Sequence, residues 1–232
     1  MTLLEVRALD AFYGDFQALA GLTLDVRAGE TVALVGANGA GKTTFLKCLV
    51  GLITDKRGEI RFAGDLIAGK PAERIAQLGL SLVPEGRLLF PSLTVEENLM
   101  MGALNRRAGS WTLQSVYDLF PILCERRRHS PNALSGGQQH MVAIGRALMS
   151  NPKLLLCDEI SLGLAPMVIE QIYQSFARIR AEGASIVLVE QDVKRAAAAS
   201  DRVYCLLKGR VTLQGSARAL SLDQLSRAYF GA

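Results

Sequence analysis

The sequence predicts an α/β fold around a mainly parallel sheet, with a helical segment inserted into it. First, an apolar run at 31–35 is typical of a buried strand and leads through a glycine-rich stretch into a helix pattern. Second, short apolar runs alternate with helix patterns along the chain, at 80–83, 153–157 and 185–189. Such alternation favours parallel strands covered by helices on both faces. Third, residues 94–150 have mostly helical patterns, which indicates an inserted helical subdomain at 86–150.

Composition narrows the class of protein. Half of the 232 residues are apolar and 21% are charged, which is typical of a globular chain. The net charge of +4 does not argue for nucleic acid, and we interpret the basic run 126–128 as solvated surface. The scattered Cys48, Cys124, Cys157 and Cys205 predict reduced thiols. Without a signal-peptide pattern or an apolar run of about 18 residues, we expect a soluble, cytoplasmic chain that reaches a membrane only through partners.

The opening segment predicts an antiparallel layer ahead of the nucleotide core. Residues 2–9 and 22–26 alternate in the manner of strands, and we interpret 11–14 as a turn that carries aromatic residues. Tyr13 has two possible roles. It is either a structural turn aromatic or a ring that stacks on an adenine base.

The stretch 36–43 is the strongest chemical signal. Strand, glycine-rich loop, Gly-Lys-Thr and helix together form a phosphate-binding P-loop, and a chance turn of this composition is the alternative. Glycines bring backbone N–H groups close to phosphate oxygens, and the helix directs its positive end at the same anion. Lys42 suits the β- and γ-phosphates, and the Thr43 hydroxyl suits Mg²⁺. The predicted nucleotide-binding residues here are Gly36, Ala37, Asn38, Gly39, Ala40, Gly41, Lys42, Thr43 and Thr44.

The remaining elements follow from caps, glycines and prolines. Thr94 and Glu97 form a predicted capping box, Pro121 closes a helix at 112–120, and Pro166 opens one that ends at Gly183. The expected helices are 42–51, 71–77, 112–120, 135–149, 166–182 and 193–200, with short helices in the last fifteen or so residues. The expected hairpins are 58–64 and 202–214, the latter turning at Lys208-Gly209.

Two carboxylates end the apolar run at 153–157. Open parallel sheets place ligands at the carboxyl ends of their strands, so Asp158 is a candidate to hold Mg²⁺. Glu159 points elsewhere and is a candidate to polarise an attacking water. Simple surface charge is the alternative interpretation.

A second glycine motif opens the helix at 135–149. Ser135, Gly136 and Gly137 offer free N–H groups, a helix dipole and a hydroxyl, the parts of an anion site. By itself, this motif favours an ordinary serine N-cap followed by two flexible glycines.

With these motifs in place, the whole chain resembles the ATP-binding subunits of ATP-binding cassette (ABC) transporters. Leu134 to Gln138 matches their signature motif, and 36–43 matches their Walker A loop. The resemblance implies an ABC ATPase fold: a RecA-like core with an antiparallel β-subdomain at 1–85 and 151–232, and a helical subdomain at 86–150. It also implies a head-to-tail dimer, with itself or a second ATPase subunit, in which Ser135, Gly136, Gly137 and Gln138 contact the partner's ATP.

Residue by residue, the resemblance assigns further roles. Tyr13 matches the adenine-stacking aromatic, Asp158 the Walker B aspartate and Glu159 the catalytic glutamate, with Lys42 beside the phosphates. Glu85 lies at the Q-loop position, 161–165 at the D-loop, and Gln191 at the switch-histidine position. ATP and Mg²⁺ are the implied cofactors, and Thr43, Asp158 and Glu85 are the implied metal residues.

The departures from the usual motifs point to one branch. Pro-Glu-Gly-Arg at 84–87, Val-Glu-Gln at 189–191 and Ser-Leu-Gly-Leu-Ala-Pro at 161–166 resemble the LivF-type ATPases of branched-chain amino acid importers. This implies integral-membrane permease partners, an indirect periplasmic solute-binding protein, and a place on the inner face of the membrane. An importer of amides or urea and a cytosolic ABC-type assembly factor are the alternatives. Leu88, Leu89 and Phe90 either dock the permease or pack in the core.

Overall fold

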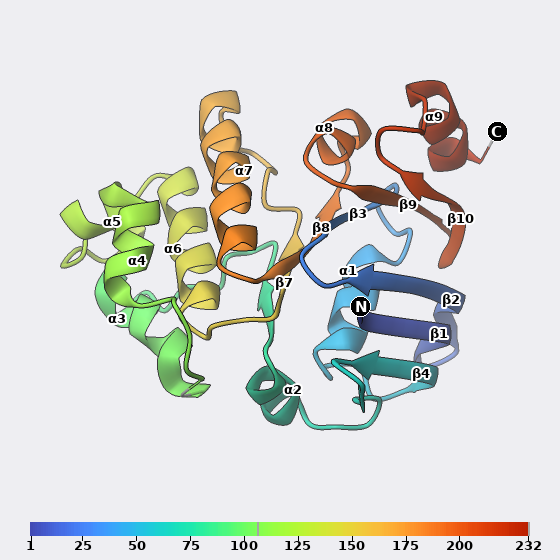
Figure 1. Cartoon of the computed structure of the whole chain (residues 1–232), viewed down its shortest axis with the longest axis horizontal. Helices are drawn as coiled ribbons and strands as arrows, with labels where there is room; N and C mark the ends of the chain where they lie inside the picture. The colour runs from blue at the N-terminus through green and yellow to red at the C-terminus, as the bar shows by residue number, and fades with distance from the viewer. Residues whose placement is uncertain (106, 232) are drawn as a thin grey trace. The chain divides into compact units, whose positions relative to one another are not determined.

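The computed structural model describes residues 1–105 and 107–231, which form two compact units. The first combines Met1–Ile75 with the chain from Ser185 onward, and the second is Ala76–Ala184. Figure 1 shows strands gathered in the first and helices in the second. The second unit also holds two strands and α7, so its bounds differ from the subdomain limits 86–150, which stay a prediction.

An antiparallel sheet opens the first unit, in the order β2-β1-β4-β5. Its strands are β1 (Thr2–Tyr13), β2 (Phe16–Arg27), β4 (Lys56–Phe62) and β5 (Asp65–Leu66). The turn predicted at 11–14 is wrong, because β1 continues to Tyr13 and only Gly14 and Asp15 turn. The buried Ala11 and Leu19 pair across the strands, and this pairing extends the hairpin to Tyr13.

The other strands of the first unit belong to a second sheet, in which they follow the order β10-β9-β3-β8. Its strands β3 (Thr31–Val35), β8 (Ser185–Glu190) and β9 (Arg202–Leu207) are parallel, and β10 (Arg210–Ser216) pairs antiparallel with β9. Helices α1 (Lys42–Leu49), α8 (Val193–Ala198) and α9 (Leu222–Phe230) belong to this unit, whereas α2 (Ala72–Leu78) crosses its limit. The predicted short helices at the end are one helix, α9.

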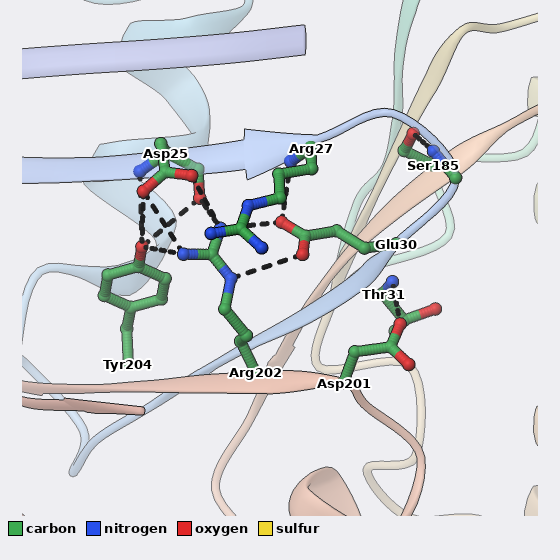
Figure 2. Close-up of polar contacts among 9 residues, drawn as sticks. Asp25, Arg27, Glu30, Thr31, Ser185, Asp201, Arg202 and Tyr204 are labelled. Atoms are coloured by element: carbon green, nitrogen blue, oxygen red, sulfur yellow. Dashed lines mark hydrogen bonds and ion pairs between the residues drawn. The ribbon is translucent and has the colours of Figure 1, made fainter. Parts of the chain in front are cut away.

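A polar network ties β2 to β9 at the amino end of β3 (Figure 2). The Arg202 guanidinium donates to the Asp25 carboxylate at 2.8 Å and to the Glu30 carboxylate at 2.7 Å. The Tyr204 hydroxyl donates to the Asp25 carboxylate at 3.2 Å. The Asp201 carboxylate accepts a hydrogen bond from the Thr31 amide at 2.8 Å. The network therefore joins the two sheets of the unit at the end of β3 opposite the P-loop.

The second unit pairs two parallel strands, β6 (Leu80–Val83) and β7 (Leu154–Asp158), and contains most of the helices. These are α3 (Val95–Met101), η1 (Gly102–Asn105), α4 (Leu113–Leu119), α5 (Pro121–Glu125), η2 (Pro131–Ala133), α6 (Gly136–Leu148) and α7 (Pro166–Ala181). The predicted capping box of Thr94 and Glu97 is present. Pro121 was expected only to close a helix, but it also begins α5, because proline suits a first helical turn.

Two predictions drawn from the composition are confirmed. The basic run 126–128 is exposed, and all four cysteines are free thiols. Among the residues that the structure describes, no helix is both long and apolar enough to cross a bilayer.

Candidate functional site

The P-loop connects β3 to α1 within the first unit. Gly39 and Gly41 adopt left-handed backbone angles, with φ of 78° and 106°. A side chain at Gly36 would collide with the Leu206 carbonyl, and one at Gly41 would lie 2.8 Å from a methyl of Leu19. Glycine is therefore required at these positions by backbone angle or by close approach.

Lys42 lies inside this loop. Its side chain is 4% exposed, and its Nζ donates to the carbonyl oxygens of Gly36 at 2.7 Å and Ala37 at 3.2 Å. No side chain caps the amino end of α1, whose N-cap residue is Gly41. An ammonium and helix-terminal amides at one loop suit phosphate oxygens, so the residues present fit a nucleotide triphosphate.

Tyr13 and Gln191 come to the P-loop from two different sheets, after β1 and β8. Tyr13 ends β1, is 47% exposed, and has its hydroxyl 3.4 Å from Oγ1 of Thr44. Gln191 follows β8, whose last residue, Glu190, pairs in register with Val35 at the end of β3. Gln191 therefore lies at the same sheet edge as the start of the P-loop.

The predicted acidic residues follow two neighbouring parallel strands of the second unit. Val83 of β6 pairs with Cys157 of β7, so Glu85 and the pair Asp158 and Glu159 leave neighbouring parallel strands on the same side. Asp158 is 3% exposed and Glu159 7% exposed, whereas Glu85 is exposed. Glu159 has a φ of 47°, a strained angle for a non-glycine residue and one that is typical of functional positions.

The described residues hold no cluster of three or more histidine, cysteine or acidic side chains that could bind a metal alone. This donor set still fits Mg²⁺, which takes one or two carboxylates and completes its shell with waters and phosphate oxygens. Thr43 in the first unit, and Asp158 and Glu85 in the second, are the predicted metal residues.

Ser135–Gln138, here called the signature turn, begins α6. Ser135 and Gln138 form a reciprocal capping box, with the Ser135 amide donating to the Gln138 side chain at 3.0 Å. The ordinary N-cap is therefore present, and the glycines have packing reasons as well. A side chain at Gly137 would collide with Val168 of α7, and one at Gly136 would approach the Arg87 guanidinium.

Sequence reasoning missed the side chains that hold residues 84–90, here called the Glu85 loop. Arg146 of α6 donates to the carbonyls of Arg87 and Leu88, and the buried Asn98 of α3 bonds the backbone of Phe90. The sequence signal that could have predicted these contacts is a polar residue, Arg146 or Asn98, on a helix face that is otherwise apolar. Leu88 and Phe90 are 68% and 43% exposed, so neither is a core residue.

Comparisons with known proteins agree with these features. A family model described as "ABC transporter" matches residues 19–161. The chain is 44% identical to the high-affinity branched-chain amino acid transport ATP-binding protein BraG of Pseudomonas aeruginosa, covering 99% of this chain and 100% of BraG. It is 33% identical to a probable branched-chain amino acid transport ATP-binding protein, LivF, of Archaeoglobus fulgidus, covering 94% of each.

Solved structures show the same fold. The structure of an ATP-binding subunit of an ABC transporter matches with a TM-score of 0.83 and 31% identity, covering 98% of this chain and 99% of that one. A dimeric ATP-binding cassette in a post-hydrolysis state, bound to ADP and phosphate, matches with a TM-score of 0.83 and 25% identity. That match covers 94% of this chain and 100% of the cassette.

Proposed function

This chain belongs to the ABC transporter family, and we propose that it is the ATP-hydrolysing subunit of a membrane importer for branched-chain or other amino acids. The observation that carries the proposal is the 44% identity to BraG over 99% of this chain and 100% of BraG, because partial matches would support only the nucleotide chemistry. The P-loop around Lys42 supports the ATPase part independently of any relative.

ATP binding is assigned to the first unit. The N–H groups of 36–44 and the Lys42 ammonium would contact the phosphates, where the loop already gathers positive charge. The half-exposed ring of Tyr13 would stack on the adenine. Gln191 would donate a hydrogen bond toward the γ-phosphate from the edge of β8.

Hydrolysis to ADP and phosphate is assigned to the carboxylates of the second unit. Glu159 would orient and polarise the attacking water, and its strained backbone supports a functional role. Asp158, Thr43 and Glu85 would hold Mg²⁺, which when bound neutralises charge on the transferred phosphoryl group. With the cation among them, the repulsion between these carboxylates is offset.

A dimer completes the proposed site. We assign the signature turn of each copy to the ATP bound by its partner, either a second copy or another ATPase subunit. The amides of Gly136 and Gly137 at the start of α6 would then stabilise phosphoryl charge together with Lys42. The dimeric cassette matched above supports this arrangement.

A permease is the proposed membrane partner, on the inner face of the membrane. A groove of about 360 Å³ in the second unit is lined by Leu88, Phe90 and Met101, among others. Exposed apolar side chains beside an open groove suit a docking helix. Glu85 is three residues before Leu88 in the same loop, which would link permease contact to the nucleotide site. We assign a periplasmic solute-binding protein to the same assembly only through the permease.

The first test is ATP hydrolysis with Mg²⁺ by the wild type and by Glu159→Gln. We expect the variant to lose at least about 100-fold in turnover while it still binds ATP, because only water activation is removed. The exposed Glu125→Gln is the matched control and should hydrolyse like the wild type. A wild type that neither binds nor hydrolyses ATP would overturn the proposal.

The solute is tested in the assembled transporter. The chain is co-expressed with its permease and reconstituted in vesicles, and ATP-dependent uptake of leucine, isoleucine and valine is measured beside urea and amides. Uptake of the amino acids that stops with Glu159→Gln would support the proposal. Uptake of urea alone, or no association with a permease, would contradict its transport part.

A further inference from the structure

We propose that Arg87 is a positioning residue for ATP hydrolysis, which locks the Glu85 loop to the first turn of α6 and so fixes the signature turn. The inference rests on the proposed function, because it concerns the residues assigned above to the nucleotide. Its structural part, a contact between Arg87 and α6, is testable without ATP.

The Arg87 side chain reaches three positions on α6 at once. Its Nη1 donates to Oε1 of Gln139 at 2.8 Å, and its Nε donates to Nδ1 of His140 at 3.1 Å. Its Nη2 lies 3.2 Å from where a Cβ on Gly136 would be. A planar guanidinium makes such a set of contacts, whereas a lysine ammonium cannot reproduce its fork.

The backbone of the Glu85 loop at Arg87 is also fixed to α6. Arg87 and Leu88 have φ of 62° and 45°, two consecutive non-glycine residues in the left-handed region. Arg146 donates to both of their carbonyls, at 2.9 and 2.7 Å, and its own helix is again α6. Strained angles persist only where surrounding contacts determine them, so this loop is built to stay in register with α6.

His140 makes the contact chemically specific. Because Arg87 donates to Nδ1, that nitrogen must carry a lone pair, which requires the neutral ring. Burial, followed by the charge of Arg87, lowers the pKa of His140 to about 4. The same Nδ1 lies 3.2 Å from the Gly136 carbonyl, to which it donates only when it carries a proton.

The mechanical consequence concerns Glu85 and the signature turn. Glu85 is two residues before Arg87, and Gly136 lies against the guanidinium. A displacement of the Glu85 loop therefore either breaks the Arg87 contacts or carries the first turn of α6 with it. Since a misplacement of about 1 Å costs up to about 100-fold in rate, this link would tune hydrolysis without touching ATP.

The structural test is a histidine titration by NMR, and the chain has only two histidines. In Arg87→Gln we expect the pKa of His140 to rise, because the neighbouring charge is gone and Nδ1–H is free to bond the Gly136 carbonyl. The signal of the exposed His129 should not change between proteins and serves as the internal control. An unchanged His140 titration would overturn the contact and the proposal.

The kinetic test compares Arg87→Gln and Arg87→Lys with the wild type. We expect Arg87→Gln to lower kcat about 10- to 100-fold with an unaltered Kd for ATP, and Arg87→Lys to recover only part of the loss. The exposed Arg126→Gln is the matched control and should retain full kcat. A shifted His140 titration with unchanged kcat would overturn the positioning role.

The two proposals fail in different ways. Failure of the proposed function appears in the wild type, which would not bind or hydrolyse ATP. Failure of the Arg87 inference appears only in the comparison between its variants and an active wild type, or in the histidine titration.

Discussion

At the scale of single residues, Gln191 is the departure from the family's motifs with the clearest chemical consequence. It follows the buried strand β8 at the edge where β3 leads into the P-loop, and the family resemblance implies a histidine there. A glutamine amide donates a hydrogen bond but carries neither a proton to transfer nor a positive charge. In the proposed role, Gln191 would therefore stabilise the γ-phosphate less than an imidazolium would.

We predict that Gln191→His raises ATP turnover several-fold, because it adds a group that can carry charge beside the phosphates. The measurement is steady-state hydrolysis by the isolated chain and by the permease complex. The isosteric Gln191→Glu should instead lower turnover, since it places another negative charge at this edge. Equal turnover of the wild type and Gln191→His, alone and in the complex, would contradict the prediction.

Single residues also show what the sequence could predict about the site. Lys42 and the Ser135 cap were predictable, because their roles depend on neighbours within a few positions. The Arg87 contacts to Gln139 and His140 were not, because they join residues more than fifty positions apart. Packing decides such contacts, and one sequence contains no pattern for them.

At the scale of elements, the boundaries set by local capping agree with prediction, as do the strands at 80–83 and 202–207, whereas the end of β1 does not. The capping box at Thr94 fixed the start of α3 as expected. The end of β1 was misplaced, because glycine and aromatic residues at 11–14 resemble a turn until the pairing with 16–19 is known. The roles predicted for Tyr13 stay open to test, since they depend on the nucleotide.

The junction of β2, β3 and β9 gives a prediction about stability. Arg202 is the shared donor to Asp25 and Glu30, and its loss would leave two carboxylates with unpaired charge (Figure 2). We predict that Arg202→Met lowers the free energy of unfolding by about 1–2 kcal/mol, less than for a fully buried pair because the Asp25 side chain is 39% exposed and solvent screens its charge. Urea denaturation at pH 7 measures it, with the exposed Arg218→Met as control.

The pH dependence at this junction has a defined sign. The hydrogen bond from Arg202 lowers the pKa of Asp25 below its ordinary value in the folded chain. The resulting stability is present above the unfolded pKa of about 4 and is lost as pH falls through the lower folded pKa. As the pH falls from about 5 toward about 1, the wild type should therefore lose more stability than Arg202→Met. An equal loss of stability with falling pH in the wild type and in Arg202→Met would contradict this account.

At the scale of the whole molecule, the fold was predictable to the level of its strands and helices. Apolar runs of strand length and amphipathic helices carry the periodicity that sets each element, as β3, β7 and α6 illustrate. The surface is less predictable, because apolar residues such as 88–90 read equally well as core. Exposure of Leu88 and Phe90 separates these possibilities.

The last prediction concerns that surface and the membrane partner. Leu88, Phe90, Met101 and Leu104 are exposed in the second unit, and the first three line the groove assigned above to the permease. We predict that Leu88→Asp abolishes co-purification with the permease, because a charge would be buried at the contact without a partner. Its thermal midpoint should match the wild type, since the side chain is 68% exposed and contributes little to the core.

Leu66→Asp is the matched control for this experiment, because Leu66 is also an exposed leucine and lies in the first unit, away from the groove residues in sequence. It should co-purify with the permease like the wild type. Retained binding by Leu88→Asp would move the permease contact elsewhere on the chain. Loss of binding by both variants would show that any added charge disrupts the complex, and the groove would lose its assigned role. Selective loss with Leu88→Asp would connect permease binding to the loop that carries Glu85 and Arg87, and so to hydrolysis.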